Sequence, residues 1–198
     1  LTFKLMFNRR LYWIPDAMPF MNLGKTVYDP EFQVDKLPDD LALRGNIALE
    51  GLTEITERRG QVAKEYMSAL YGLDGIGIFQ PPKFASCGYL RFPVLLTDEK
   101  TRRYILNEGH KLGISGMYPG TVSGIPVLKP NLAEDLQDCP DSRRIASTLV
   151  TLPTHFGVKD SDIERTVSFI RKNLKSGLRK NTTIKETKWR KSLTSKNI

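Results

Sequence analysis

The sequence predicts an α+β fold: a small mixed or antiparallel sheet with helices packed on one face, preceded by a long helix. Two helical apolar stripes, near residues 41–70 and 163–174, and a strongly strand-like stretch at 87–96 lead to this prediction. Shorter helix-like and strand-like segments alternate between them. A single sheet covered by helices is the simplest arrangement that buries the apolar side of each segment.

The first predicted element is a helix that runs from about Pro38 to Tyr71. Proline suits the first turn of a helix, and Asp39 and Asp40 are favourable at the positive end of the helix dipole. Apolar residues follow at helical spacing: Leu41, Ala48, Leu52, Ile55, Val62, Tyr66 and Leu70. Glycine weakens helices, so the helix is expected either to be held by packing or to break near Gly60.

Strands are predicted at 75–79, 87–96, 114–118 and 148–152 from their branched and aromatic residues. The stretch 87–96 is the strongest of the four. Pro93 lies inside it, and proline has no N–H to donate to a neighbouring strand. Pro93 therefore predicts that this strand is at an edge of the sheet or contains a bulge.

The remaining predicted elements are helices. Thr97 is placed to cap a helix that begins at Asp98 and ends before Gly113. A short helix is predicted at 141–146. The last helix has a clear apolar stripe, made of Ile163, Val167, Ile170 and Leu174.

The charge is unevenly distributed along the chain. Of the net charge of +8, residues 171–198 contribute +9, from ten Lys or Arg and one acid, and residues 1–170 sum to about −1. We predict an irregular aromatic and proline-rich contact segment at 1–36, a folded domain at 37–175 and a basic, mobile tail at 176–198. A tail of this kind can bind an anionic membrane surface or nucleic acid.

Few residues carry recognisable chemistry. Cys87 and Cys139 fit no zinc pattern and predict reduced thiols in a cytoplasmic protein. No continuous apolar stretch is long enough to span a membrane, and no signal peptide is recognisable at the start. The two histidines, His110 and His155, form no catalytic or metal motif. His155, at the end of a predicted strand, is the better candidate for a site.

Four segments carry a resemblance to a known family. They are 37–59, ending LTEITERR; 89–94, reading YLRFPV; 112–119, reading LGISGMYP; and 146–155, reading ASTLVTLPTH. Taken together and in this order, they resemble the small C-terminal domain of the DegT/DnrJ/StrS aminotransferases. The resemblance covers about 140 residues and implies the C-terminal domain of a fold-type I aminotransferase.

The resemblance implies a pyridoxal-phosphate-dependent enzyme that transfers an amino group to a nucleotide sugar. The lysine that binds the cofactor belongs to a large N-terminal domain in this family. We therefore expect no catalytic residue and no cofactor on this chain alone. The chain would instead supply part of the substrate pocket wall and subunit contacts in a homodimer, with the N-terminal domain as its partner.

The resemblance also nominates individual residues. Val34 and Lys36 occupy the positions of an Asn-x-Arg pair that reaches the cofactor phosphate across the subunit interface, so Lys36 keeps only the charge. Tyr118 is a candidate for binding sugar or phosphate, next to Met117, where the family has histidine. His155 is a weaker candidate for the substrate. The alternative hypothesis is a non-catalytic interaction module of the same fold, whose basic tail binds a membrane or nucleic acid.

Overall fold

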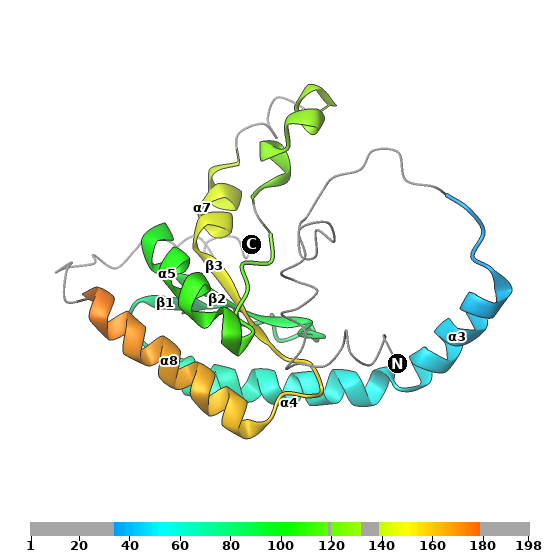
Figure 1. Ribbon diagram of the computed structural model, residues 1–198, viewed down its shortest axis with the longest axis horizontal. Coiled ribbons are helices and arrows are strands. Elements are labelled where there is room, and N and C mark those ends of the chain that lie inside the picture. The colour runs from blue at the N-terminus through cyan, green and yellow to red at the C-terminus, as the bar shows by residue number, and fades with distance from the viewer. Residues whose placement is uncertain (1–33, 119, 132–138, 179–198) are drawn as a thin grey trace.

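The computed structural model describes residues 34–118, 120–131 and 139–178 (Figure 1). Two predicted segments lie largely outside this range. They are the contact segment 1–36, of which residues 1–33 are outside, and the tail 176–198, of which residues 179–198 are outside. In chain order the elements are α3 (Asp39–Glu50), α4 (Leu52–Leu70), β1 (Ile76–Ile78), β2 (Arg91–Leu96), α5 (Glu99–Gly109), η1 (His110–Leu112), η2 (Val122–Gly124), η3 (Pro126–Asn131), α7 (Pro140–Thr148), β3 (Leu149–Pro153) and α8 (Asp160–Leu178). None of the helices among the described residues combines the length and apolar character needed to cross a membrane.

The strands form one antiparallel sheet in the order β1-β2-β3. Phe92 and Val94 of β2 lie opposite Leu152 and Val150 of β3. Burial alternates along β2, because successive side chains of a strand point to opposite faces. All four of these residues are fully buried and lie on the same face of the sheet. The predicted α+β class is confirmed, with antiparallel pairing throughout the sheet.

The position predicted for Pro93 is wrong, because β2 is the central strand. β1 ends at Ile78, which lies opposite Val94, so its pairing with β2 stops one residue short of Pro93. Pro93 is in register only with Thr151 of β3. The proline is tolerated because β1 is too short to require an N–H at this position.

Helices α4, α5 and α8 contribute to one apolar core against the buried face of the sheet (Figure 1). The ring of Tyr66 in α4 lies 5.6 Å from that of Phe92, measured between centroids. Ile105 of α5 is fully buried in the same cluster. The predicted stripe of α8 is confirmed, since Ile163, Val167, Ile170 and Leu174 are all buried.

The long first helix is interrupted at Gly51 rather than at Gly60, and Pro38 precedes α3 instead of forming its first turn. Gly60 lies within α4, where the following turns are held by buried Val62, Tyr66 and Leu70. In contrast, α3 has no buried residue, so no packing enforces a continuous helix across Gly51. The break therefore falls in the unburied part of the chain, N-terminal to the buried stripe that begins at Val62.

Helix α5 is capped by Asp98, which corrects the prediction of Thr97. The Asp98 carboxylate accepts a hydrogen bond from the Thr101 N–H at 2.8 Å, and the Thr97 hydroxyl donates to the same carboxylate at 3.0 Å. Burial alone would raise the pKa of Asp98, but the hydrogen bonds from Thr101, Thr97 and Lys100 outweigh it and lower this pKa. At its other end, the helix continues into η1 and stops at Gly113, which has a left-handed φ of 77°.

Replacement of Asp98 by alanine is expected to lower the free energy of unfolding by about 1 kcal/mol at neutral pH. Because the pKa of Asp98 is lower in the folded chain, the stabilisation is present above the ordinary carboxyl pKa of about 4 and is lost as the pH falls through the lower value. Urea unfolding of both proteins at pH 7 and pH 3 measures this difference. Glu99→Ala, which removes an exposed ion pair with Arg103 and an acid of the same first turn but no cap, is the control and should cost a few tenths of a kcal/mol.

Candidate functional site

The segment 114–118 carries the candidate Tyr118, and it is a turn rather than the predicted strand. Only Ser115 pairs with β3, through an isolated bridge to Thr151. The Ser115 N–H donates to the Thr151 carbonyl at 3.1 Å, and the Thr151 N–H donates to the Ser115 carbonyl at 2.7 Å. Positive φ angles at Gly113 and Met117, 77° and 58°, turn the backbone on both sides of this bridge and leave no room for a longer ladder.

Tyr118 follows this turn directly. Its N–H donates to the Gly116 carbonyl at 2.8 Å, which closes a tight bend before the side chain. The side chain is 60% exposed. A phenol presented in this way can donate to, or accept from, a ligand hydroxyl or phosphate.

The candidate His155 is exposed and follows the end of β3. Its ring meets that of Phe156 edge-on, with 6.5 Å between centroids. The preceding Thr154 is buried, and its hydroxyl donates to the Leu90 carbonyl at 2.9 Å. This bond fixes the backbone beside His155 against the entrance to β2.

The candidate Lys36 precedes α3, at the far end of the molecule from α5 and α7 (Figure 1). Its side chain is 90% exposed and its ammonium lies 3.7 Å from the carboxylate of Asp39. An ion pair this exposed contributes little to stability. Within the described residues, Lys36 is therefore held by nothing that would direct it to a particular ligand.

The structure does not bring the three candidates together. In the antiparallel bridge, Ser115 lies opposite Thr151. Tyr118 is three residues beyond Ser115 and so lies towards the start of β3, whereas His155 is four residues beyond Thr151 in the opposite direction. The two side chains therefore belong to opposite ends of β3, and Lys36 lies beyond α3.

Arg91 supports this turn, although the sequence did not indicate it as a candidate. Arg91 of β2 donates from Nε to the Thr151 hydroxyl at 2.7 Å, from Nη2 to the Thr151 carbonyl at 3.0 Å and from Nη2 to the Gly113 carbonyl. The sequence of the strand contained one indication of such a role, because Arg91 is a charged residue next to Phe92 in an otherwise apolar strand. Its partners, however, come from distant parts of the chain, and no sequence pattern relates them.

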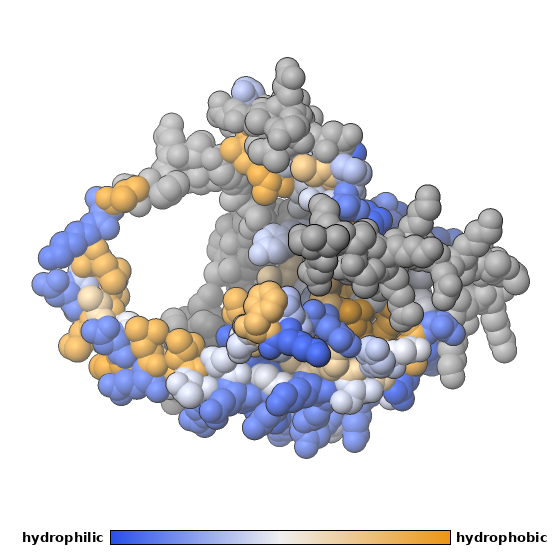
Figure 2. All heavy atoms as spheres, turned by 180° about the vertical axis from the view of Figure 1, so that it is seen from behind, coloured by the Kyte–Doolittle hydropathy of each residue, from blue (hydrophilic) through white to orange (hydrophobic). Residues whose placement is uncertain are grey.

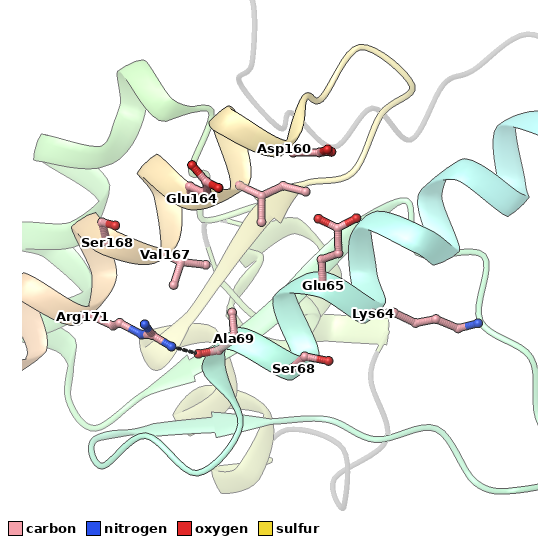
Figure 3. Close-up of a pocket in the computed structure, with 10 residues that line it drawn as sticks. Lys64, Glu65, Ser68, Ala69, Asp160, Glu164, Val167, Ser168 and Arg171 are labelled. Carbon is pink, nitrogen blue, oxygen red and sulfur yellow. Dashed lines mark hydrogen bonds between the residues drawn. The ribbon is translucent and has the colours of Figure 1, made fainter.

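A groove between α4 and α8 lies apart from all three candidates (Figure 3). The Arg171 side chain closes one part of it by donating to the Ala69 carbonyl at 2.6 Å. Its rim includes the acids Glu65 and Glu164, while Lys64 points away from α8 (Figure 3). Acidic, basic, polar and apolar side chains line this open groove, and their arrangement does not favour one class of ligand.

Each lysine whose side chain is described is exposed to solvent: Lys36, Lys64, Lys83, Lys100, Lys111, Lys159 and Lys172. Over the described residues, no cluster of three or more His, Cys, Asp or Glu is arranged to hold a metal ion.

Solved aminotransferase structures share this fold. The aminotransferase TlmJ from Streptoalloteichus hindustanus is 24% identical, with a TM-score of 0.56, over 67% of this chain and 35% of TlmJ. DesV from S. venezuelae is 20% identical, with a TM-score of 0.63, over 83% of this chain and 43% of DesV. A sugar aminotransferase from Micromonospora echinospora is 18% identical, with a TM-score of 0.54, over 63% of this chain and 32% of that protein.

At these identities the similarity is one of fold, and the chain spans less than half of each of these proteins. A comparison with curated protein sequences gives no match. The model of the DegT/DnrJ/EryC1/StrS aminotransferase family, however, matches residues 34–171, which is more than half of the chain. The resemblance noted in the sequence is thus confirmed, and the chain belongs to the DegT/DnrJ/EryC1/StrS aminotransferase family.

Proposed function

We propose that this chain is the C-terminal part of a pyridoxal-phosphate-dependent sugar aminotransferase and is not competent alone. In this proposal the chain supplies part of the wall of the substrate pocket and contacts between subunits. A large domain, on the same or a separate polypeptide, holds the cofactor. We call this chain together with that domain the complete enzyme, and we infer that it is a cytoplasmic homodimer that uses a nucleotide sugar.

The observation that carries the proposal is the apolar surface of α3. Leu41, Leu43, Ile47 and Leu49 are 47–62% exposed, and α3 contains no buried residue. Figure 2 shows hydrophobic side chains along this helix. Leu41 and Leu43 are two residues apart and so lie on nearly opposite sides of the helix. Apolar residues on more than one side of a helix favour its burial, so the surface of α3 supports further protein packed against it.

The length of the related structures supports the same proposal. The chain covers 35% of TlmJ and 43% of DesV, while those structures match 67% and 83% of the chain. The lobe therefore corresponds to a minor part of a larger fold. The rest of such a fold is the natural cover for α3.

The cofactor would come from the larger domain. Pyridoxal phosphate, when bound, supplies an electron sink for the transfer of the amino group. In the proposed assembly, Tyr118 faces the sugar or its phosphate and can form hydrogen bonds through its hydroxyl. His155 is a second, weaker candidate for the substrate. Lys36 would offer a positive charge to the cofactor phosphate across the subunit interface.

Spectroscopy with pyridoxal phosphate tests the proposal. We expect the 198-residue chain alone to give no internal-aldimine absorption band in the violet, whereas the complete enzyme should give this band. It should also transfer an amino group from an amino acid to a 3-keto or 4-keto nucleotide sugar. Borohydride reduction followed by peptide mass spectrometry locates the modified lysine. A stoichiometric adduct on a lysine of residues 1–198 would contradict the proposal.

The interaction module remains the alternative function, motivated by the seven Lys or Arg residues among positions 179–198. Binding of the isolated chain to acidic vesicles or to RNA, without aminotransferase activity in any longer polypeptide, would support that alternative. Sedimentation with vesicles at low and high salt measures it, because electrostatic binding weakens as salt increases.

A further inference from the structure

The turn that carries Tyr118 adopts a backbone that it would not adopt by itself. Met117 has a φ of 58°, in the left-handed region that non-glycine residues seldom occupy. A residue held there costs on the order of 1 kcal/mol and persists only where its surroundings impose the conformation. Two local bonds contribute, from the Met117 N–H to the Ser115 hydroxyl at 3.1 Å and from the Tyr118 N–H to the Gly116 carbonyl at 2.8 Å. The remaining constraints come from outside the turn.

Arg91 supplies the first external constraint. Its guanidinium joins the Gly113 carbonyl, at the start of the turn, to the hydroxyl and carbonyl of Thr151 in β3. The Thr151 hydroxyl then donates to the Ser115 carbonyl at 3.0 Å. Arg91 therefore contacts the start of the turn directly and its middle through Thr151.

The contacts of Arg91 explain why an arginine is needed there. Burial lowers the pKa of Arg91, which means that its charge is partly removed from water. Its three acceptors at Gly113 and Thr151 are neutral oxygens that a planar fork can reach together. A lysine at this position would keep the charge but would lose the planar guanidinium, whose separate N–H groups donate to several acceptors at fixed angles.

Arg102 of α5 supplies the second external constraint. Its Nε donates to the Leu149 carbonyl at 2.8 Å, at the start of β3. A Cβ atom on Gly116 would lie only 2.6 Å from Nη2 of Arg102, so the guanidinium packs directly against the Gly116 backbone. Two arginines from different elements therefore hold the turn. Arg91 of β2 contacts its start at Gly113, and Arg102 of α5 packs against Gly116, one residue before Met117.

We propose that Arg91, assisted by Arg102, is a positioning residue for Tyr118 and sets how this tyrosine meets the sugar substrate. The proposal rests on the proposed function, since it assumes that Tyr118 lines the substrate pocket of the complete enzyme. Arg91 does not touch the substrate. It acts through Gly113, Thr151 and Ser115 on the turn.

A double-mutant cycle in the complete enzyme tests the role in catalysis. Arg91→Lys is expected to reduce kcat/KM for the nucleotide sugar by about tenfold or more, because small displacements of a positioned group cost this much. The half-reaction with the amino donor should change less than about twofold. With Tyr118→Phe already present, Arg91→Lys should have little further effect on the sugar half-reaction, because both changes remove the same contact.

Two results would overturn this role. Additive losses in the cycle would mean that Arg91 does not act through Tyr118. Equal losses in both half-reactions would indicate general damage to the fold. Arg103→Lys is the matched control, since Arg103 lies next to Arg102 on α5 but forms only an exposed ion pair with Glu99. It should leave both half-reactions unchanged.

Hydrogen exchange on the 198-residue chain tests the constraint without any activity. Arg91→Lys should speed exchange of the Ser115 and Thr151 amides by about tenfold, while the amide of Ile105 in the core is unchanged. If Arg91→Lys does not fold, Thr151→Val removes the same hydroxyl bridge with less disturbance. Unchanged exchange at Ser115 would overturn the inference. If the unsubstituted complete enzyme has no aminotransferase activity but Arg91→Lys still speeds exchange at Ser115, the proposed function is refuted. The structural constraint of Arg91 on the turn would then stand.

Discussion

Replacement of Phe92 by alanine is expected to lower the free energy of unfolding by about 3–5 kcal/mol, the usual cost of removing a buried ring. Phe92 is fully buried in the central strand and lies opposite Leu152. Its ring contacts those of Tyr66 and Tyr89, at 5.6 and 6.2 Å between centroids. The cavity left behind would lie between α4 and the sheet, where the surrounding elements can close it only in part.

Urea unfolding followed by circular dichroism measures this loss. Phe84→Ala is the matched control, because the same atoms are removed from a side chain that is 93% exposed. It should change the free energy of unfolding by less than about 0.5 kcal/mol. If Phe92→Ala leaves too little folded protein to measure, Phe92→Leu should give an intermediate loss. Equal effects at positions 84 and 92 would contradict the described core.

Substitution of Ile47 by glutamate in α3 is expected to have little effect on stability in one context and a large effect in another. In the 198-residue chain, Ile47 is 59% exposed, so the free energy of unfolding should change by less than about 0.5 kcal/mol. In the complete enzyme the same change would place a charge in a covered apolar surface. It should then cost about 3 kcal/mol or more, because an unpaired buried charge is strongly destabilising.

The comparison of thermal unfolding in the two contexts separates these outcomes. Asn46→Glu is the control, since it introduces the same charge at an exposed polar position of the same helix. It should be tolerated in both contexts. A complete enzyme that tolerates Ile47→Glu as well as Asn46→Glu would show that α3 is not covered, and the main support for the proposed function would be lost.

Several elements could be predicted because their signals are local. The stripe of Ile163, Val167, Ile170 and Leu174 has a helical period, and all four residues are buried in α8. The strand around Phe92 was recognised from its composition, although it begins at Arg91 and not at residue 87. Periodicity reports which side of an element is apolar, and burial follows wherever a neighbour exists to cover that side.

In the first predicted helix, apolar spacing did not by itself lead to burial. Leu41 and Leu52 share the spacing of Val62 and Tyr66, but only the latter two are buried. The apolar pattern runs through both α3 and α4, whereas only α4 has neighbouring elements that bury its apolar residues. Spacing therefore predicted the face of the helix but neither the break at Gly51 nor the start of the buried stripe at Val62.

By itself, the sequence determined the α+β class, the apolar faces of α4 and α8 and the family to which the chain belongs, since each depends on residues close together or in a fixed order. Only the tertiary structure decided that Pro93 lies in a central strand and that 114–118 is a turn. It also decided that Arg91 supports this turn and that Tyr118 and His155 lie at opposite ends of β3. These features depend on strand register and on contacts between residues more than 20 positions apart, which a linear pattern does not encode.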